Sequence, residues 1–372
     1  MLVPLIGSFL LVLLAAVRVS PGLRRLPRWY ALLIPLVLWL VVANLAMPLP
    51  KSYPDSPAAG LVFKAVQQLN LQSLSGIQYV FIVEGSSLTM NGFDGDRVQT
   101  VLNRSGIPSL VVQLSCAGAN HAERFEYLKE FMDALRPEQV DALRKKKVVL
   151  CHEVELGYDK NPLLNFLRNG PTGRTMRYLC PENIPMIFSW LGAKYTFNQW
   201  FREHTLLSNV VGCGLFNLFH IGYLARIQEL PAPYKENGFR PNDTQSPGFV
   251  ASKSLYPPPD SAVDKKLAQE YAQNLRWQKK RDHDMRQVLR GLVTKQCYFA
   301  FPSWAQPDAY YNLWKTRQAD ALFFDGDGTA LVNKLNSLSL WQDALHLQAP
   351  GAEIYSEEFA KYLVERIRSK DL

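Results

Sequence analysis

Three residue types that together catalyse acyl transfer occur at two places in this chain. Ser86 and Ser87 follow a short apolar run, and Asp343 precedes His346 by three positions. At that spacing, in a turn or at a helix start, the Asp343 carboxylate can accept the Nδ1–H of His346, which leaves Nε2 as a general base. A serine nucleophile, a histidine base and an aspartate that orients the base would form a triad in the order Ser, Asp, His.

The serine pair lies where α/β proteins place catalytic groups. Residues 79–83 are rich in β-branched and aromatic side chains, which predicts a buried strand. This strand stops at Gly85, and a helical pattern follows a few residues later. Backbone N–H groups at that point can stabilise a developing oxyanion. Taken separately, a serine pair before a helix is more often a cap, and an Asp-x-x-His pair more often a surface ion pair or cap.

Strands and helices alternate on both sides of a long central stretch. The predicted strands cover residues 79–83, 107–115, 147–150, 295–301 and 321–324. The predicted helices cover residues 61–74, 96–104, 122–135, 137–145, 262–293, 307–317 and 356–368. Such alternation is the pattern of a parallel sheet with right-handed crossover connections. The sequence therefore predicts a three-layer α/β domain with a five-stranded parallel sheet.

The first 50 residues are typical of a membrane anchor. Residues 2–17 and 29–47 are apolar runs, and the second is close to the length of about 20 residues that spans a bilayer. The loop between them carries four arginines, which the positive-inside rule keeps cytoplasmic. We expect one or two transmembrane helices in residues 1–50, in the cytoplasmic (inner) membrane, with the catalytic domain on the periplasmic or extracytoplasmic side.

The predicted α/β domain is interrupted by an insertion. Its first part covers residues 51–154 and its second part residues 261–372, with residues 155–260 between them. Residues 206–225 carry no charged side chain, and residues 230–260 are rich in Pro, Asn and Ser. We interpret the former stretch as a buried or membrane-facing helix, with a third span as the alternative, and the latter as a long loop.

Charge and cysteine content argue against two classes of protein. The chain has 41 basic and 33 acidic residues, and four of the basic residues belong to the first 50. The remaining surplus is small and diffuse, whereas nucleic-acid binding needs a basic face. The five cysteines lack the spacing of a zinc site or a disulfide framework. We therefore predict no metal site and no cofactor.

Two blocks of the sequence resemble motifs of SGNH/GDSL-type hydrolases, in the membrane-anchored branch that includes DltD-like and alginate O-acetylation proteins. Residues 85–89 (GSSLT) resemble the Gly-Asp-Ser-Leu-Thr block, with Ser87 in the place of the nucleophile. Residues 343–347 (DALHL) resemble the terminal Asp-x-x-His-Leu block. Gly351 and Ser356 are similar to the Gly and Ser that open the last helix in that branch.

The resemblance covers residues 78–153 and 295–368 and implies a flavodoxin-like α/β/α fold. It also implies a serine esterase or O-acyltransferase that acts on a cell-envelope polysaccharide or polymer. Acetyl or D-alanyl groups are the acyl units that the family implies. A polytopic membrane O-acyltransferase is the implied partner protein. The resemblance does not explain residues 155–260.

The resemblance also names candidates for an oxyanion hole. Gly118 matches the family's oxyanion-hole glycine, so the N–H groups of Ser87 and Gly118 are the expected donors, with Asn120 as a further candidate. Two positions depart from the family pattern. Ser86 stands where the family has an Asp, and it remains an alternative nucleophile. Glu153 stands where the family has an oxyanion-hole Asn, and an ionised carboxylate cannot donate a hydrogen bond.

Two other classes of function stay open. The departures from the family pattern keep open a non-catalytic binding or assembly subunit on the same scaffold. Residues 323–329 (FFDGDGT) resemble the first motif of haloacid-dehalogenase phosphatases, which would use Asp325, Asp327 and Mg²⁺. Those enzymes have a basic residue and a metal-binding acidic pair well downstream, and only 45 residues follow Asp327 here. We interpret residues 325–328 as a turn that closes the fifth strand.

Overall fold

The computed structural model describes most of the predicted α/β domain. The described residues are 57–116, 119, 121–153, 280–281, 283–289, 291–302, 322–324 and 329–372, with a few single residues and pairs between 185 and 246. The expected anchor, most of the expected insertion, most of the expected helix at 262–293 and the expected helix at 307–317 lie outside them. Among the helices that are described, none is both long enough and apolar enough to cross a membrane.

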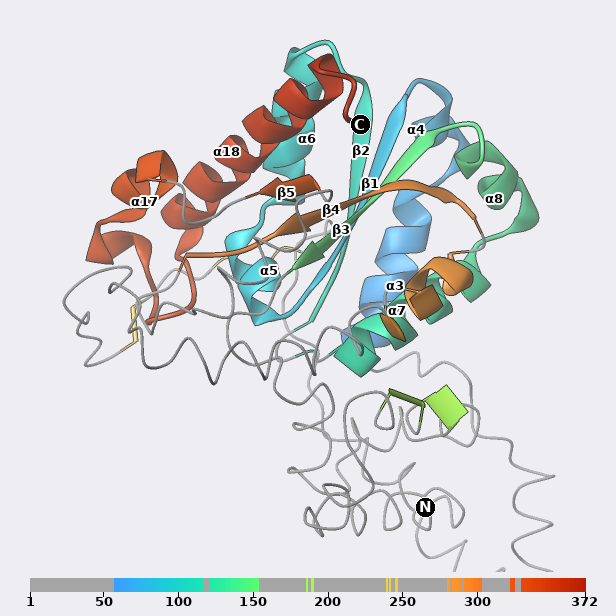
Figure 1. Cartoon of the computed structure of the whole chain (residues 1–372), viewed down its shortest axis with the longest axis horizontal. Helices are drawn as coiled ribbons and strands as arrows, with labels where there is room; N and C mark the ends of the chain where they lie inside the picture. Colours follow the sequence, from blue (N-terminus) through green and yellow to red (C-terminus); the bar gives the residue numbers. More distant parts are fainter. Residues whose placement is uncertain are drawn as a thin grey trace, which may run out of the picture. The chain divides into compact units, whose positions relative to one another are not determined.

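A five-stranded parallel sheet forms the centre of the domain (Figure 1). Its strands are β1 (Tyr79–Gly85), β2 (Ser109–Ser115), β3 (Lys147–Glu153), β4 (Val293–Phe299) and β5 (Leu322–Phe324). Their order is β2-β1-β3-β4-β5, and every neighbouring pair is parallel. The predicted α/β fold with a five-stranded parallel sheet is confirmed.

The strand order puts a topological switch point between β1 and β3. The chain adds β2 on one side of β1 and then crosses to add β3 on the other side. In open α/β sheets, ligands bind beyond the carboxyl ends of the strands at such a point. The registers bring Gly85 beside Ser115 and Glu84 beside His152, so β1, β2 and β3 end close together. Residues that follow Gly85 and those around Glu153 therefore meet at this edge.

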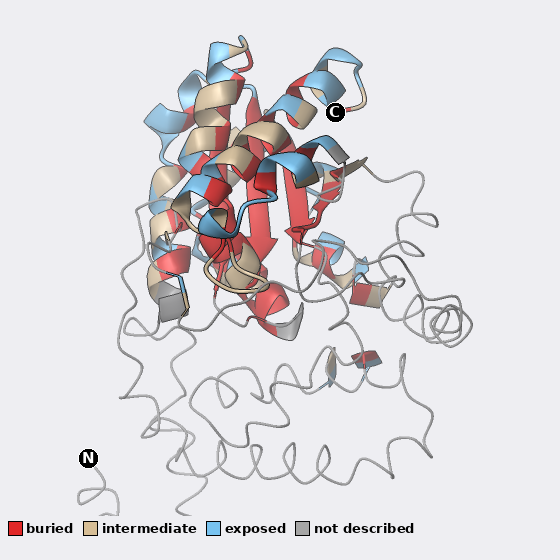
Figure 2. Ribbon diagram, turned by 90° about the vertical axis from the view of Figure 1, so that its left-hand side faces the viewer, coloured by how far each residue is buried: buried red, intermediate tan, exposed pale blue. Residues whose placement is uncertain are grey.

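Helices cover both faces of the sheet (Figure 1). One side carries α5 (Ser87–Gly92), α6 (Gly95–Arg104), α17 (Thr329–Leu335) and α18 (Ala349–Arg368), and the other carries α3 (Pro57–Gln68), α4 (Leu71–Ser75), α7 (His121–Ala134) and α8 (Pro137–Leu143). Because both faces are covered, β1 is buried along its whole length, and Figure 2 shows the middle of the sheet in red. The side chains of Tyr79, Phe81 and Val83 belong to the core shared with α6 and α18.

The structure differs from the predicted helices at four places. Asn70 divides the predicted helix at 61–74, because its side chain accepts the N–H of Ser73 at 2.8 Å and starts a new helix. The last helix begins at Ala349, where Pro350 suits its first turn. The short helices α5 and α17 were not predicted, since six or seven residues are too few for a clear helical period.

Candidate active site

Ser87 is the first residue of α5, directly after β1. Ser86 is the N-cap of this helix, and its Oγ accepts the N–H of Leu88 at 3.2 Å. The first helical hydrogen bond runs from the N–H of Met90 to the carbonyl of Ser86 at 3.0 Å. A helix that starts immediately at the end of a buried strand thus presents Ser87 at the carboxyl edge of the sheet, at the switch point.

Asp343 and His346 belong to a short loop that the chain closes on itself. Trp341 and Leu347 form an antiparallel bridge, and the N–H of Gln342 donates to the carbonyl of His346 at 2.8 Å. Trp341 and Leu347 are buried in the core, and Trp341 Nε1 donates to the carbonyl of Leu335 at 2.8 Å. The loop is therefore anchored at both ends. Of the two expected settings for the Asp-x-x-His block, a turn or a helix start, the structure has the turn.

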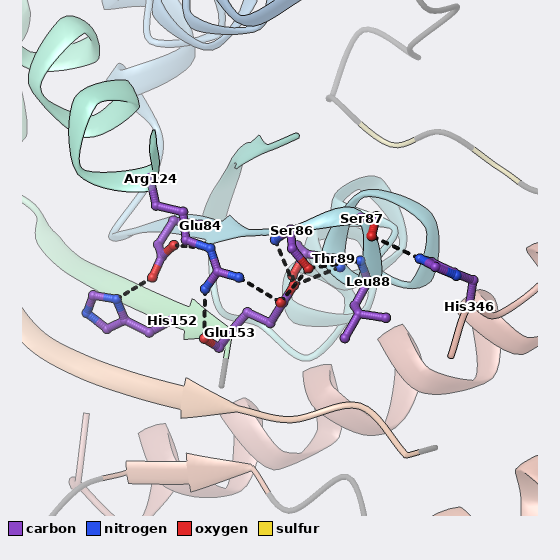
Figure 3. Close-up of polar contacts among 9 residues, drawn as sticks. All are labelled: Glu84, Ser86, Ser87, Leu88, Thr89, Arg124, His152, Glu153 and His346. Carbon is purple, nitrogen blue, oxygen red and sulfur yellow. Dashed lines mark hydrogen bonds and ion pairs between the residues drawn. The ribbon is translucent and has the colours of Figure 1, made fainter. Parts of the chain in front are cut away.

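The structure brings Ser87, His346 and Asp343 into one hydrogen-bonded chain. His346 Nε2 lies 2.9 Å from Ser87 Oγ, a contact drawn in Figure 3. His346 Nδ1 lies 2.9 Å from each carboxylate oxygen of Asp343. These are the distances expected between a nucleophile, its base and the group that orients the base.

The Asp343 carboxyl stays ionised at neutral pH. Burial raises its pKa, but the hydrogen bond from the His346 ring and the N–H groups of Leu345 and His346 outweigh burial and lower the pKa to about 2. At neutral pH the carboxylate therefore accepts the proton of Nδ1. This tautomer leaves Nε2 as the acceptor that faces Ser87.

One backbone donor remains available beside the nucleophile. The N–H groups of Ser86 and Thr89 donate to the carboxylate of Glu153, and that of Leu88 donates to Ser86 Oγ. Within the described part of the chain, the N–H of Ser87 has no such partner, and the first turn of a helix leaves it unused. The two other expected oxyanion donors, Gly118 and Asn120, lie outside the described residues.

Glu153 does not face Ser87 Oγ. Its Oε1 accepts Ser86 Oγ at 2.6 Å, and its Oε2 accepts the N–H groups of Ser86 and Thr89 at 2.9 and 3.0 Å and also the hydroxyl of Thr89. Figure 3 shows the carboxylate on the side of Ser86 and Thr89, while the Ser87 hydroxyl points to His346. The Ser86 hydroxyl is thus bonded to Glu153 and to the helix start, and it has no contact with His346.

Arg124, on α7, lies directly against Glu153. Its Nη2 is 2.8 Å from Glu153 Oε1, and its Nη1 donates to the Glu153 carbonyl at 3.0 Å. Its Nε lies 3.5 Å from Glu84, whose other oxygen lies 2.7 Å from His152 Nδ1. All four side chains are buried.

Sequence reasoning missed the roles of Glu84, Thr89 and Arg124 in the network of hydrogen bonds and ion pairs around Glu153. A usable signal was Glu84, a charged residue inside a strand that is otherwise apolar, because a buried charge needs a partner. The identity of that partner could not be read from the sequence, since Arg124 is 40 positions away on a helix.

No candidate metal centre accompanies the site. Within the described residues, no group of three His, Cys, Asp or Glu side chains is arranged to hold a metal ion. Asp325 and Asp327, the pair that resembles a phosphatase motif, lie outside those residues. Comparisons of the chain with family models, with curated proteins and with solved structures find no match.

Proposed function

We propose that this protein is a serine acyl-hydrolase or O-acyltransferase with Ser87 as its nucleophile. The observation that carries the proposal is the hydrogen-bonded chain from Ser87 Oγ through His346 to Asp343, with 2.9 Å at each step. The position of Ser87 at a strand end and a helix start, beside the switch point of the sheet, supports the same reading.

The reaction begins with attack on an ester carbonyl. His346 Nε2 takes the hydroxyl proton of Ser87 while Oγ bonds to the carbonyl carbon, and the carbonyl oxygen becomes an oxyanion. The N–H of Ser87 donates to that oxyanion, and Asp343 stabilises the charge on the imidazolium. The tetrahedral intermediate then collapses, the bond to the alcohol oxygen breaks, and the leaving alkoxide takes the proton from His346.

A second displacement releases the acyl group. His346 Nε2 takes a proton from a water molecule or from an acceptor hydroxyl, which attacks the carbonyl of the acyl-serine. When this intermediate collapses, Ser87 Oγ leaves and takes the proton back. Water gives a carboxylic acid, whereas a sugar or polyol hydroxyl gives a new ester.

The finer parts of the proposal come from the sequence. The order β2-β1-β3-β4-β5 is compatible with the flavodoxin-like SGNH fold that the motifs imply. An anchor in residues 1–50 would place the domain outside the cytoplasmic membrane, which makes a cell-envelope polysaccharide or polymer the proposed substrate. Acetyl or D-alanyl groups are the proposed acyl units, and a polytopic O-acyltransferase is the proposed partner.

Turnover of an activated ester tests the proposal. The full-length protein in detergent should hydrolyse p-nitrophenyl acetate, and Ser87→Ala should abolish the activity while Ser86→Ala keeps part of it. If Ser87→Ala turns over as fast as the wild type, Ser87 is not the nucleophile. If the wild type is folded but does not hydrolyse the ester, a non-catalytic binding subunit explains the protein better.

A further inference from the structure

We propose that Glu153 is a positioning residue that fixes Ser87 for catalysis. The inference rests on the proposed function, because it assigns a role toward the reaction of Ser87. Glu153 reaches the nucleophile only through its neighbours: Ser86 on one side and Thr89 on the other (Figure 3).

The carboxylate holds the strand-to-helix turn at four points. It accepts the backbone N–H and the hydroxyl of Ser86, and the backbone N–H and the hydroxyl of Thr89. Ser86 and Thr89 are 67 and 64 positions from Glu153 in the sequence, so the contacts are tertiary. The backbone of Ser87 is thus held from both directions, although its own side chain has no contact with Glu153.

This arrangement also decides which N–H group faces the reaction. The start of a helix offers several unused N–H groups. Glu153 takes those of Ser86 and Thr89, and Ser86 Oγ, itself held by Glu153, takes that of Leu88. The N–H of Ser87 is left for the oxyanion. Without the carboxylate, these donors would compete for the same charge, and the turn would be free to rotate Ser87 away from His346.

Glu153 is itself held in place by Arg124. One nitrogen of the guanidinium contacts the Glu153 side chain at 2.8 Å and another contacts its carbonyl at 3.0 Å. The side chain and the backbone of Glu153 are therefore both fixed by one rigid, planar group. Glu84 lies 3.5 Å from Arg124 Nε, so it borders the group that holds Glu153.

Close approach at Gly85 is a second sign that the turn is built around this carboxylate. A Cβ atom at Gly85 would lie 2.6 Å from Glu153 Oε2 and would also collide with the Thr89 side chain. Only a residue without a side chain lets the end of β1 come this near to Glu153 and Thr89. Gly85 thus leaves the space that the Glu153 carboxylate needs to contact Ser86 and Thr89.

The test measures kcat, KM and the free energy of unfolding of Glu153→Gln beside the wild type, in the full-length protein. The substitution keeps the size of the side chain but replaces one acceptor oxygen with an amide donor beside the turn that carries Ser87. With p-nitrophenyl acetate, Glu153→Gln should lower kcat about 100-fold with little change in KM, the size of effect that a small misplacement of a reacting group produces.

Two variants of Thr89 keep the test valid if Glu153→Gln does not fold. Thr89→Ser retains the hydroxyl that donates to Glu153, whereas Thr89→Val has nearly the same shape without it. The serine variant should keep most of the wild-type kcat and the valine variant should lose it, at unchanged KM. A merely structural contact would change the stability of these variants without lowering kcat at unchanged KM.

The outcomes separate the two proposals. Wild-type kcat in folded Glu153→Gln, or equal kcat in Thr89→Ser and Thr89→Val, would overturn the positioning role while Ser87 remained the nucleophile. A folded wild-type protein in which Ser87 does not react would overturn the proposed function, and the role of Glu153 with it.

Discussion

Ser87 Oγ lies 2.9 Å from His346 Nε2, although 259 positions separate the two residues in the chain. The first comes from the junction of β1 and α5, and the second from the loop that precedes α18. Because α18 packs against α5 and α6, the site is complete only when the C-terminal helix is docked. A substitution that undocks α18 should therefore also abolish catalysis.

Asp343→Asn should lower kcat strongly and leave the fold intact. The amide keeps the size of the side chain but no longer stabilises the tautomer and the charge that His346 needs. Comparable substitutions in serine hydrolases lower kcat about 10⁴-fold. Measurement of kcat with an activated ester, beside the folded state by circular dichroism, checks this. A wild-type kcat in Asp343→Asn would remove Asp343 from the mechanism.

Asp343 should also contribute a pH-dependent term to stability. Its pKa is lowered from 3.8 to about 2 in the folded protein, so its contribution is fully present above about pH 4 and is lost as the pH falls toward 2. Urea unfolding of the wild type and of Asp343→Asn between pH 6 and pH 2 measures it. The difference in unfolding free energy should shrink across that window. A difference that does not depend on pH would contradict the lowered pKa.

Gly85→Ala should damage both stability and activity. The added methyl group would collide with Thr89 and with Glu153 at the end of β1. Overpacking of this kind costs about 1–3 kcal/mol. Gly76→Ala is the matched control, because a Cβ at Gly76 meets no atom within 4 Å and its φ is −97°. Thermal unfolding and ester turnover of both variants check this. Equal unfolding temperatures and equal kcat values in Gly85→Ala and Gly76→Ala would contradict the close approach at Gly85.

Gly351→Ala should displace the loop that carries Asp343 and His346. A Cβ at Gly351, in the first turn of α18, would lie 2.5 Å from the Leu340 carbonyl, just before that loop. We expect a large fall in kcat and only a small fall in the free energy of unfolding, because the loop can shift away while the helix stays docked. Gly60→Ala in α3 is the control, because nothing lies within 4 Å and alanine favours a helix by about 1 kcal/mol. Retained kcat in Gly351→Ala would show that the loop tolerates the shift.

Local patterns in the sequence predicted the sheet and the pair of residues in the C-terminal block. The β-branched run before Gly85 and the spacing of Asp343 and His346 are local signals, and the structure has a strand and a closed turn there. The motif register also favoured Ser87 over Ser86, and it is Ser87 that lies against His346. Its role as nucleophile stays a prediction.

The network under the turn could not be predicted, because it depends on contacts between distant elements. Ser86 and Glu153 were noted separately, as two departures from the motif that the chain resembles. In the structure they contact each other, with Ser86 Oγ 2.6 Å from Glu153 Oε1. The two departures are thus one paired feature: a hydroxyl that donates and a carboxylate that accepts. No local pattern links two residues 67 positions apart.

The most direct test of the central claim is labelling of the full-length protein with a fluorophosphonate probe, followed by mapping of the adduct by mass spectrometry. A serine reacts with this probe when a neighbouring base activates it. This mechanism predicts an adduct on Ser87 in the wild type and in Ser86→Ala, and no adduct in His346→Ala or Ser87→Ala. An adduct on Ser86, or labelling that survives in folded His346→Ala, would contradict it.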